Sequence, residues 1–300
     1  MFLLIQEDIE LRKLKSHVNN VLRKDFYKNR IVKCCPICGG IHYIKHGLYK
    51  GIQRYKCKEC NKTFSKTTNS LWSYSKKNPE LWMEFIELMV EKKSLRFCAE
   101  KLNISLVTAF YWRHKVLYGL SLEGTPNSLQ GIIYIAKTIL PENFKGCRNI
   151  EFDFTTQRRR NIWIIGAKGD EDSMFVKPIF KDIWDWKTFN KKVYSKIEKK
   201  SYMVPYGDRY IGVAAKEHNK KRVLEVKGDD RLKYFILNLE NWIGVFCGVA
   251  TKYLQRYLSF FVLFNLDKLY DYMQIMDCNL LNGNRFIKTN KIRNIENYMY

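Results

Sequence analysis

The sequence has few acidic residues and no long uncharged apolar run. Its 300 residues include 30 Asp and Glu against 53 Lys and Arg, which gives a formal net charge of +23. The apolar start is followed at once by Glu7, Asp8 and Glu10, which does not fit a secretory signal peptide. The most apolar stretch near the end, Tyr257 to Leu266, is too short to span a bilayer. We therefore expect a cytoplasmic protein with reduced thiols and no membrane partner.

The cations are concentrated near the start of the chain. Between Leu11 and Lys66, fifteen Lys and Arg residues accompany two acids, Asp25 and Glu59. Charge of this density predicts contact with the phosphates of a nucleic acid, and a solvated basic face without a partner is the alternative. A membrane surface is disfavoured because no basic run coincides with a long amphipathic face. With 46% hydrophobic residues, the chain is long enough for two or more domains.

Two Cys-x2-Cys pairs lie within this basic region and are separated by eighteen residues. This spacing is typical of a zinc ribbon, in which four thiolates bind one structural Zn²⁺. The predicted ligands are Cys35, Cys38, Cys57 and Cys60. Four free thiols or two disulfides are the alternatives, and Cys34 competes with Cys35 as a ligand. The other cysteines lack ligand spacing and are expected to be ordinary buried residues: Cys98, Cys147, Cys247 and Cys278.

Local patterns predict two small units before residue 120. Apolar residues at three- and four-residue steps predict a leader helix within residues 1–30, ahead of a ribbon at 31–70 with a β-hairpin at His42–Gln53. Cations interleaved with aromatic residues on the ribbon are candidate phosphate contacts: Arg54, Lys56, Lys58 and Lys62.

Residues 78–120 have the pattern of a helix-turn-helix. Ala99 would let two helices approach, residues 102–104 would form the turn, and Ser105 would cap the helix that enters the major groove. An unrelated helical hairpin is the alternative. Candidate groove-facing residues on the second helix are Thr108, Tyr111, Trp112, Arg113 and Lys115.

After a linker at residues 119–130, the patterns change to those of an α/β domain with one mixed sheet, at residues 131–265. The predicted strands are Gly131–Leu140, Asn161–Ala167, Met174–Phe180, Tyr202–Tyr206 and Arg222–Val226. The predicted helices are Trp186–Glu198, Tyr210–Glu217 and Leu232–Val245. Residues 144–160 look like an exposed basic insertion. The Asn- and Lys-rich residues 266–300 look like a disordered tail, and the product of a drifted reading frame is the alternative.

Four motifs, in this order along the chain, resemble those of bacterial insertion-sequence transposases with an InsA-like zinc ribbon. They are Cys35-Pro-x-Cys-Gly, Arg54-Tyr-Lys-Cys-Lys-x-Cys-x-Lys-Thr-Phe, Thr108-Ala-Phe-x-Trp-Arg-His-Lys and Gly248-Val-Ala-Thr-Lys-Tyr-Leu. The resemblance covers roughly residues 30–265. It implies a DDE-type, ribonuclease-H-like catalytic domain, recognition of terminal inverted repeats in double-stranded DNA, and a homo-oligomer on DNA. It also implies Mg²⁺ or Mn²⁺ held by carboxylates, which would cut and join DNA by a two-metal mechanism.

The catalytic acids that the resemblance implies are incomplete. The acidic positions of the first strand fall on Tyr134, Ala136 and Lys137, none of which binds a metal ion as a carboxylate does. The second acid is matched by Asp208, for which a simple turn role is the alternative. No acid stands at the third position, around residues 231–235. Shifted substitutes would be Asp153 for the first acid and Asp230 or Glu240 for the third.

Three hypotheses follow. The first is a transposase-family protein that binds element ends in the nucleoid while its catalytic site is degenerate. The second is an active transposase with shifted carboxylates. The third is a zinc-ribbon transcriptional regulator whose α/β domain serves to dimerise or to bind a partner.

Overall fold

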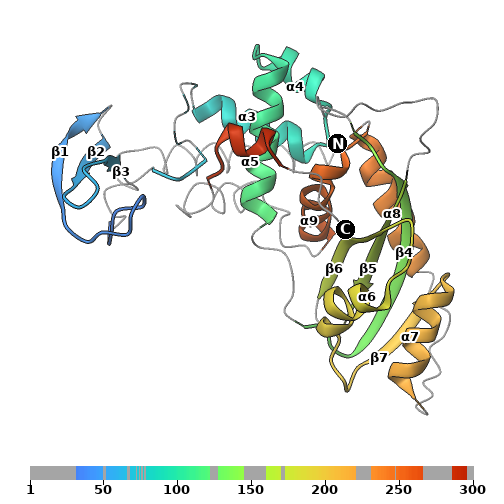
Figure 1. The fold of residues 1–300 in the computed structure, drawn as a ribbon. Coiled ribbons are helices and arrows are strands. Elements are labelled where there is room, and N and C mark those ends of the chain that lie inside the picture. Colours follow the sequence, from blue (N-terminus) through green and yellow to red (C-terminus); the bar gives the residue numbers. More distant parts are fainter. Residues whose placement is uncertain are drawn as a thin grey trace, which may run out of the picture. The chain divides into compact units, whose positions relative to one another are not determined.

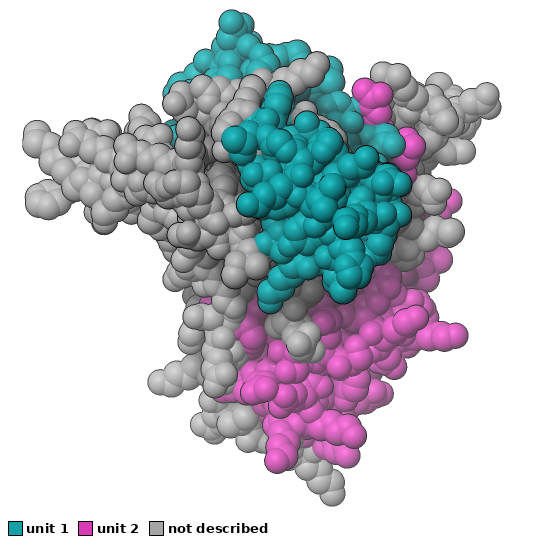
Figure 2. Space-filling model, turned by 90° about the vertical axis from the view of Figure 1, so that its left-hand side faces the viewer, with its two compact units in different colours: residues 1–122, 268–292 teal, residues 123–267, 293–300 magenta. Residues whose placement is uncertain are grey.

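The structure is a computed structural model of the whole chain. It describes residues 32–49, 52–65, 68–71, 73, 75, 77, 79–121, 128–144, 160–169, 173–220, 231–246, 248–265 and 286–295. The predicted leader helix and most of the basic insertion lie outside these residues. The chain divides into two compact units, one of residues 1–122 and 268–292 and one of residues 123–267 and 293–300 (Figure 2).

The first unit begins with a small antiparallel sheet of three strands, in the order β1-β2-β3 (Figure 1). The strands are β1 (Tyr43–Tyr49), β2 (Ile52–Cys57) and β3 (Thr63–Ser65). The predicted hairpin is therefore confirmed, and β2 runs on to the first cysteine of the second pair. The third strand follows because the Cys57 N–H bonds Lys62 O across the second turn, which returns the chain beside β2.

The helices that the structure describes after this sheet are α3 (Pro79–Val90), α4 (Leu95–Lys101), α5 (Leu106–Ser121) and α11 (Thr289–Arg293). Apolar side chains at three- and four-residue steps give α3 a buried face, where Trp82 and Phe85 are fully buried. The Trp82 ring stacks on Trp112 of α5 with centroids 3.9 Å apart. Trp112 is thus a core residue, which does not agree with its predicted place in a DNA groove.

Part of the expected tail is structured. Residues 286–292 belong to the first unit, where Ile287 and Ile292 are buried. The Lys115 ammonium lies 5.5 Å from the centre of the Phe286 ring, a cation–π contact. The expectation of a disordered tail is therefore wrong for these residues, because two isoleucines in an otherwise polar segment find a core elsewhere in the chain.

The second unit is built on a mixed sheet with the strand order β6-β5-β4-β7 (Figure 1). The strands are β4 (Ile132–Pro141), β5 (Asn161–Lys168), β6 (Met174–Lys181) and β7 (Tyr202–Tyr206). β4, β5 and β6 are antiparallel neighbours, whereas β7 is parallel to β4. Four predicted strands are confirmed, and the fifth, Arg222–Val226, lies outside the described residues.

The helices of this unit are α6 (Trp186–Lys192), α7 (Arg209–Asn219), α8 (Arg231–Val245) and α9 (Leu254–Asn265), with 3-10 turns at Tyr194–Lys196 and Thr251–Tyr253. α6 is shorter than predicted. The helix ends at Lys192, and Ile197 forms a parallel bridge with Leu129. This tertiary pairing overrides the local helix preference. None of the described helices is both long and apolar enough to cross a membrane.

The two faces of the sheet carry different helices. Ile133 and Ile135 of β4 belong to a core that also contains Phe189 of α6 and Ile211 of α7. Thr138 points to the opposite face, because side chains alternate along a strand, and its hydroxyl donates to Glu240 of α8. Polar side chains of other elements lie near the ends of these strands: Glu240 of α8 bonds Thr138 of β4, and Asp208 after β7 pairs with Lys137 of β4.

Candidate functional site

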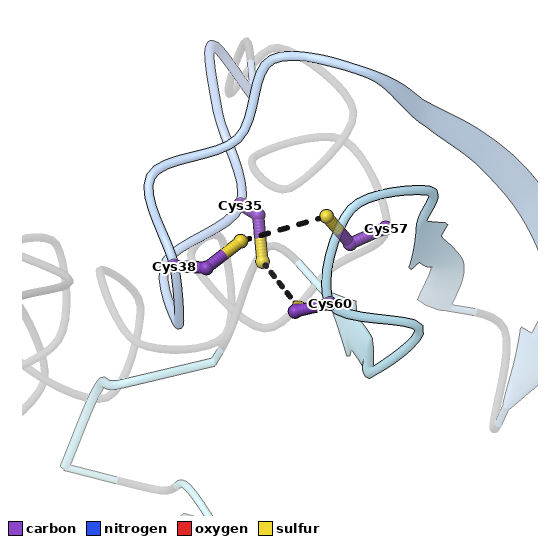
Figure 3. A group of neighbouring side chains, drawn as sticks. All are labelled: Cys35, Cys38, Cys57 and Cys60. Atoms are coloured by element: carbon purple, nitrogen blue, oxygen red, sulfur yellow. Dashed lines mark hydrogen bonds between the residues drawn. The ribbon is translucent and has the colours of Figure 1, made fainter.

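The four predicted ligands meet at one point of the first unit (Figure 3). The sulfur atoms of Cys35, Cys38, Cys57 and Cys60 all lie within 4.8 Å of one another. Cys35 Sγ is 3.8 Å from Cys60 Sγ, and Cys38 Sγ is 3.6 Å from Cys57 Sγ. A tetrahedral zinc ion with Zn–S bonds of about 2.3 Å requires sulfurs about 3.8 Å apart. The spacing therefore fits Zn²⁺ and is far too long for disulfide bonds.

Tight turns bring each pair of cysteines together. Gly39 has φ +82° and Asn61 has φ +57°, both in the left-handed region that lets the chain turn back after each Cys-x2-Cys pair. The Gly40 N–H donates to Cys38 Sγ at 3.4 Å, as backbone groups do around a thiolate. Cys34, by contrast, is exposed and is not part of the four-sulfur group, so Cys35 is the ligand at this end.

The charge state of the sulfurs also favours a bound cation. Backbone N–H groups, chiefly that of Cys60, lower the pKa of Cys57 to about 7. The Gly40 N–H lowers the pKa of Cys38, but the neighbouring thiols outweigh it and the pKa rises to about 12. Sulfurs this close therefore resist losing all their protons together, unless a metal ion compensates the charge. The donor set thus suits a structural zinc ion.

Three aromatic rings support this centre from the sheet. Tyr43, Tyr55 and Phe64 pack on the buried Cys35 and Cys57. The Tyr55 and Phe64 rings stack at 5.6 Å, and the Tyr43 hydroxyl donates to the Val32 carbonyl. With so few buried residues, this small core would gain much of its stability from a bound metal ion.

The predicted phosphate contacts of the ribbon lie on β2 and on the loop that follows it. Lys58 and Lys62 are exposed, whereas Arg54 and Lys56 are partly buried. The Arg54 guanidinium donates to Thr63 Oγ1 at 3.0 Å, which holds it along the β2–β3 edge. All four cations remain predictions as DNA contacts.

Both helices of the pair α4–α5 are capped by serines, of which Ser105 was predicted from the sequence. The Phe97 N–H donates to Ser94 Oγ, and the Thr108 N–H donates to Ser105 Oγ at 3.1 Å. Ala99 is buried, as a close helix approach requires. Thr108, Tyr111 and Lys115 are partly buried positions of α5.

Arg113 does not lie where sequence reasoning placed it. Its side chain is only 2% exposed, and its guanidinium donates to Lys93 O at 2.6 Å and to Cys98 Sγ at 3.8 Å. Arg113 therefore ties α5 to the turn before α4 and is not free to read a groove. The exposed residues at the start of α5 are Leu106 and Val107, which the sequence pattern did not single out although a recognition helix makes base contacts near its N-terminus.

Asp208 lies at the end of β7, where its carboxylate has two partners. One oxygen accepts the backbone N–H groups of Tyr210 and Ile211, at 2.9 and 3.1 Å, and so caps α7. The other oxygen forms an ion pair with the Lys137 ammonium. The capping role agrees with the alternative of a turn residue.

Lys137 lies on β4, which runs parallel to β7. Its ammonium also sits 4.0 Å from the centre of the Trp163 ring of β5. A cation is thus already bound at Asp208, between a carboxylate and the face of an indole. A divalent ion at this point would be repelled by the ammonium, and the neighbouring Ala136 has no ligand atom to offer. These residues do not fit Mg²⁺ or Mn²⁺.

Among the candidate substitute acids, the one that the structure describes does not complete a carboxylate site with Asp208. Glu240 lies on α8, but its carboxylate accepts the Thr138 hydroxyl at 2.5 Å on the face of the sheet opposite the Ile133 core. Asp153 and Asp230 lie outside the described residues. Sequence reasoning identified Asp208 but not its partner. That partner is Lys137, and the sequence signal that could have found it is a lysine where the resemblance requires an acid, on the strand that pairs with β7.

Comparison with known proteins gives one distant relative. A protein of Halobacterium salinarum, described as an uncharacterized protein in transposable element ISH50, is 24% identical over 128 residues. The match spans 42% of this chain and 42% of that relative, less than half of its length. No protein-family model and no solved structure matches the sequence. The chain is therefore distantly similar to a protein of a transposable element, and it carries a four-cysteine cluster that suits zinc.

Proposed function

We propose that this chain is a transposase-family protein that binds the ends of an insertion element and does not cut DNA. The observation that carries the proposal is the Lys137–Asp208 ion pair, which stands where the resemblance requires a carboxylate-bound metal. A lysine in that place keeps Asp208 in its capping geometry while excluding a divalent ion.

The binding half of the proposal rests on the first unit. A ribbon with a candidate metal site and exposed lysines lies in the most basic part of the chain, and a pair of capped helices follows it along the sequence. The distant relative belongs to a transposable element, which makes element ends the natural DNA target.

A ribonuclease-H-like fold for the second unit is supported by its sheet. Three antiparallel strands in sequence order, followed by a fourth that lies parallel to the first and leads into a helix, form the arrangement typical of such domains. In that arrangement the first and fourth strands carry metal-binding acids, the positions here of Ala136, Lys137 and Asp208.

The proposal is tested with the full-length, zinc-loaded chain and the DNA that flanks its reading frame. We expect a complex with the terminal inverted repeats in a mobility-shift assay, and no cut strands with either Mg²⁺ or Mn²⁺. Cleavage that disappears in Asp208→Ala would overturn the degenerate site and establish an active transposase with shifted acids. Binding only at a site other than the inverted repeats would instead favour a regulator.

A further inference from the structure

Aromatic side chains gather beside the Lys137–Asp208 pair in the second unit. Trp163 of β5, which contacts the Lys137 ammonium, has its ring centre 6.2 Å from that of Trp184, just before α6. Trp184 in turn stacks on Tyr210 of α7 with centroids 5.0 Å apart and planes 10° apart. Trp186 lies 5.2 Å from Trp184 and 6.3 Å from Tyr210. The rings form one connected cluster near the start of α6 and α7.

The cluster has a buried base and an exposed edge. Trp184 is only 9% exposed and belongs to the main core, whereas Trp186 and Tyr210 are 38% and 41% exposed. Core packing explains Trp184 but does not require two large rings at the surface. Trp186 and Tyr210, called here the aromatic corner, meet with planes 74° apart. A flat ligand could therefore stack on one ring and touch the other with its edge.

The charges around the aromatic corner leave it positive. Each nearby acid already has partners: Asp208 pairs with Lys137, and Asp182 pairs with Arg160 at 3.8 Å. Asp185 caps α6, where its carboxylate accepts bonds from the Thr188 hydroxyl and backbone N–H. These bonds lower its pKa, so it stays ionised, and its single negative charge stands against the two positive charges of Lys187 and Arg209.

The cations next to the rings are better placed for a ligand. Lys187 and Arg209 directly follow Trp186 and precede Tyr210, and both are exposed. Neither has an acidic partner within ion-pair distance among the residues that the structure describes. Both cations are therefore available to an anionic ligand bound at the aromatic corner.

From this geometry we propose that the aromatic corner binds unpaired nucleotides of single-stranded nucleic acid. Every base offers a flat face that stacks on an aromatic ring, and the phosphates beside it would meet Lys187 and Arg209. Paired bases in a duplex do not expose their faces, so double-stranded DNA is not the ligand of this surface. The chain's net charge of +23 favours such a polyanion over an apolar protein segment. The inference does not depend on the proposed function, because it concerns a different unit and a different form of nucleic acid.

The test is fluorescence anisotropy of a labelled oligothymidine, titrated with the full-length chain. Stacking on one ring contributes about 1–3 kcal/mol per base, so Trp186→Ala and Tyr210→Ala should each weaken binding by about tenfold. Trp186→Phe and Tyr210→Phe should retain most of the affinity, since the rings remain. Binding of a duplex with an inverted-repeat end should be unchanged in all four variants.

The control is Ile183→Ala, which removes the most exposed apolar side chain of the same loop, 77% exposed. It should leave oligothymidine binding unchanged. An equal loss in Ile183→Ala and Trp186→Ala would overturn the proposal in favour of a general apolar docking surface. Wild-type affinity in the Trp186→Ala/Tyr210→Ala double variant, with an unchanged urea unfolding curve, would overturn it as well.

Discussion

Lys137 and Asp208 form an ion pair whose side chains are only 15% and 8% exposed. Removing one member of such a pair leaves a charge in a poorly hydrated place. We expect Lys137→Met to lower the free energy of unfolding by about 3 kcal/mol, measured by urea denaturation.

The matched control for this pair is Asp208→Asn, which keeps an oxygen for the α7 cap while removing the charge. The double variant Lys137→Met/Asp208→Asn should lose clearly less free energy of unfolding than the sum of the losses in the two single variants, because neither charge is then left without its partner. Strict additivity would show that the two side chains do not stabilise each other.

Arg113 offers a second test of a side chain at the residue scale. Its guanidinium holds the Lys93 carbonyl in the interior, so Arg113→Ala should lower the free energy of unfolding by about 3 kcal/mol. Arg113→Lys should rescue little, because an ammonium is more strongly hydrated than a guanidinium and costs more to bury in this interior position. Thermal unfolding of both variants measures this. If Arg113→Ala instead had wild-type stability and lost DNA binding, Arg113 would be a DNA contact and not a core residue.

These two residues show where sequence reasoning stops. A positive side chain in a basic helix predicts a phosphate contact, yet Arg113 satisfies a buried carbonyl, because helix packing decides which face is hidden. Lys137 looked only like a missing acid. Its partner, 71 positions later, became visible when the parallel pairing of β4 and β7 brought the two strands together.

At the scale of elements, the zinc ribbon allows a test with two adjacent cysteines. Cys35→Ser removes a predicted ligand, whereas Cys34→Ser changes an exposed neighbour outside the sulfur group. Elemental analysis should find about one zinc per chain in the wild type and in Cys34→Ser, and much less in Cys35→Ser. Amide exchange in β1 and β2 should rise with the loss of zinc, because the small core there depends on the metal. Equal zinc in both variants would contradict the assigned ligand set.

Elements with strong local signals were predictable, and those defined by distant contacts were not. Segments rich in β-forming residues predicted β4 to β7, and Ser105 marked a helix start that the structure bears out. The end of α6 was missed because the Leu129–Ile197 bridge sets it. α11 was missed because five residues in a polar segment give no helical period. The cysteine spacing predicted the four-sulfur site completely, since ligands on two short turns need no distant contact.

For the whole molecule, the charge distribution predicts how DNA binding depends on salt. A duplex contact neutralised by one lysine changes the slope of log K against log salt by about 0.9. If Lys58 and Lys62 contact phosphates, Lys58→Ala/Lys62→Ala should make the slope for inverted-repeat DNA less steep by about 2. The measurement is a salt titration of binding by the full-length, zinc-loaded chain.

The control for this titration removes the same amount of charge from the second unit, with Lys191→Ala/Lys199→Ala at two exposed lysines. Both double variants lower the net charge of +23 equally, so a long-range effect of total charge would change both slopes alike. Direct phosphate contact at the ribbon would change only the slope of Lys58→Ala/Lys62→Ala. Equal slopes in the two variants would mean that DNA is held by the overall charge of the chain and not by direct contact with the ribbon lysines.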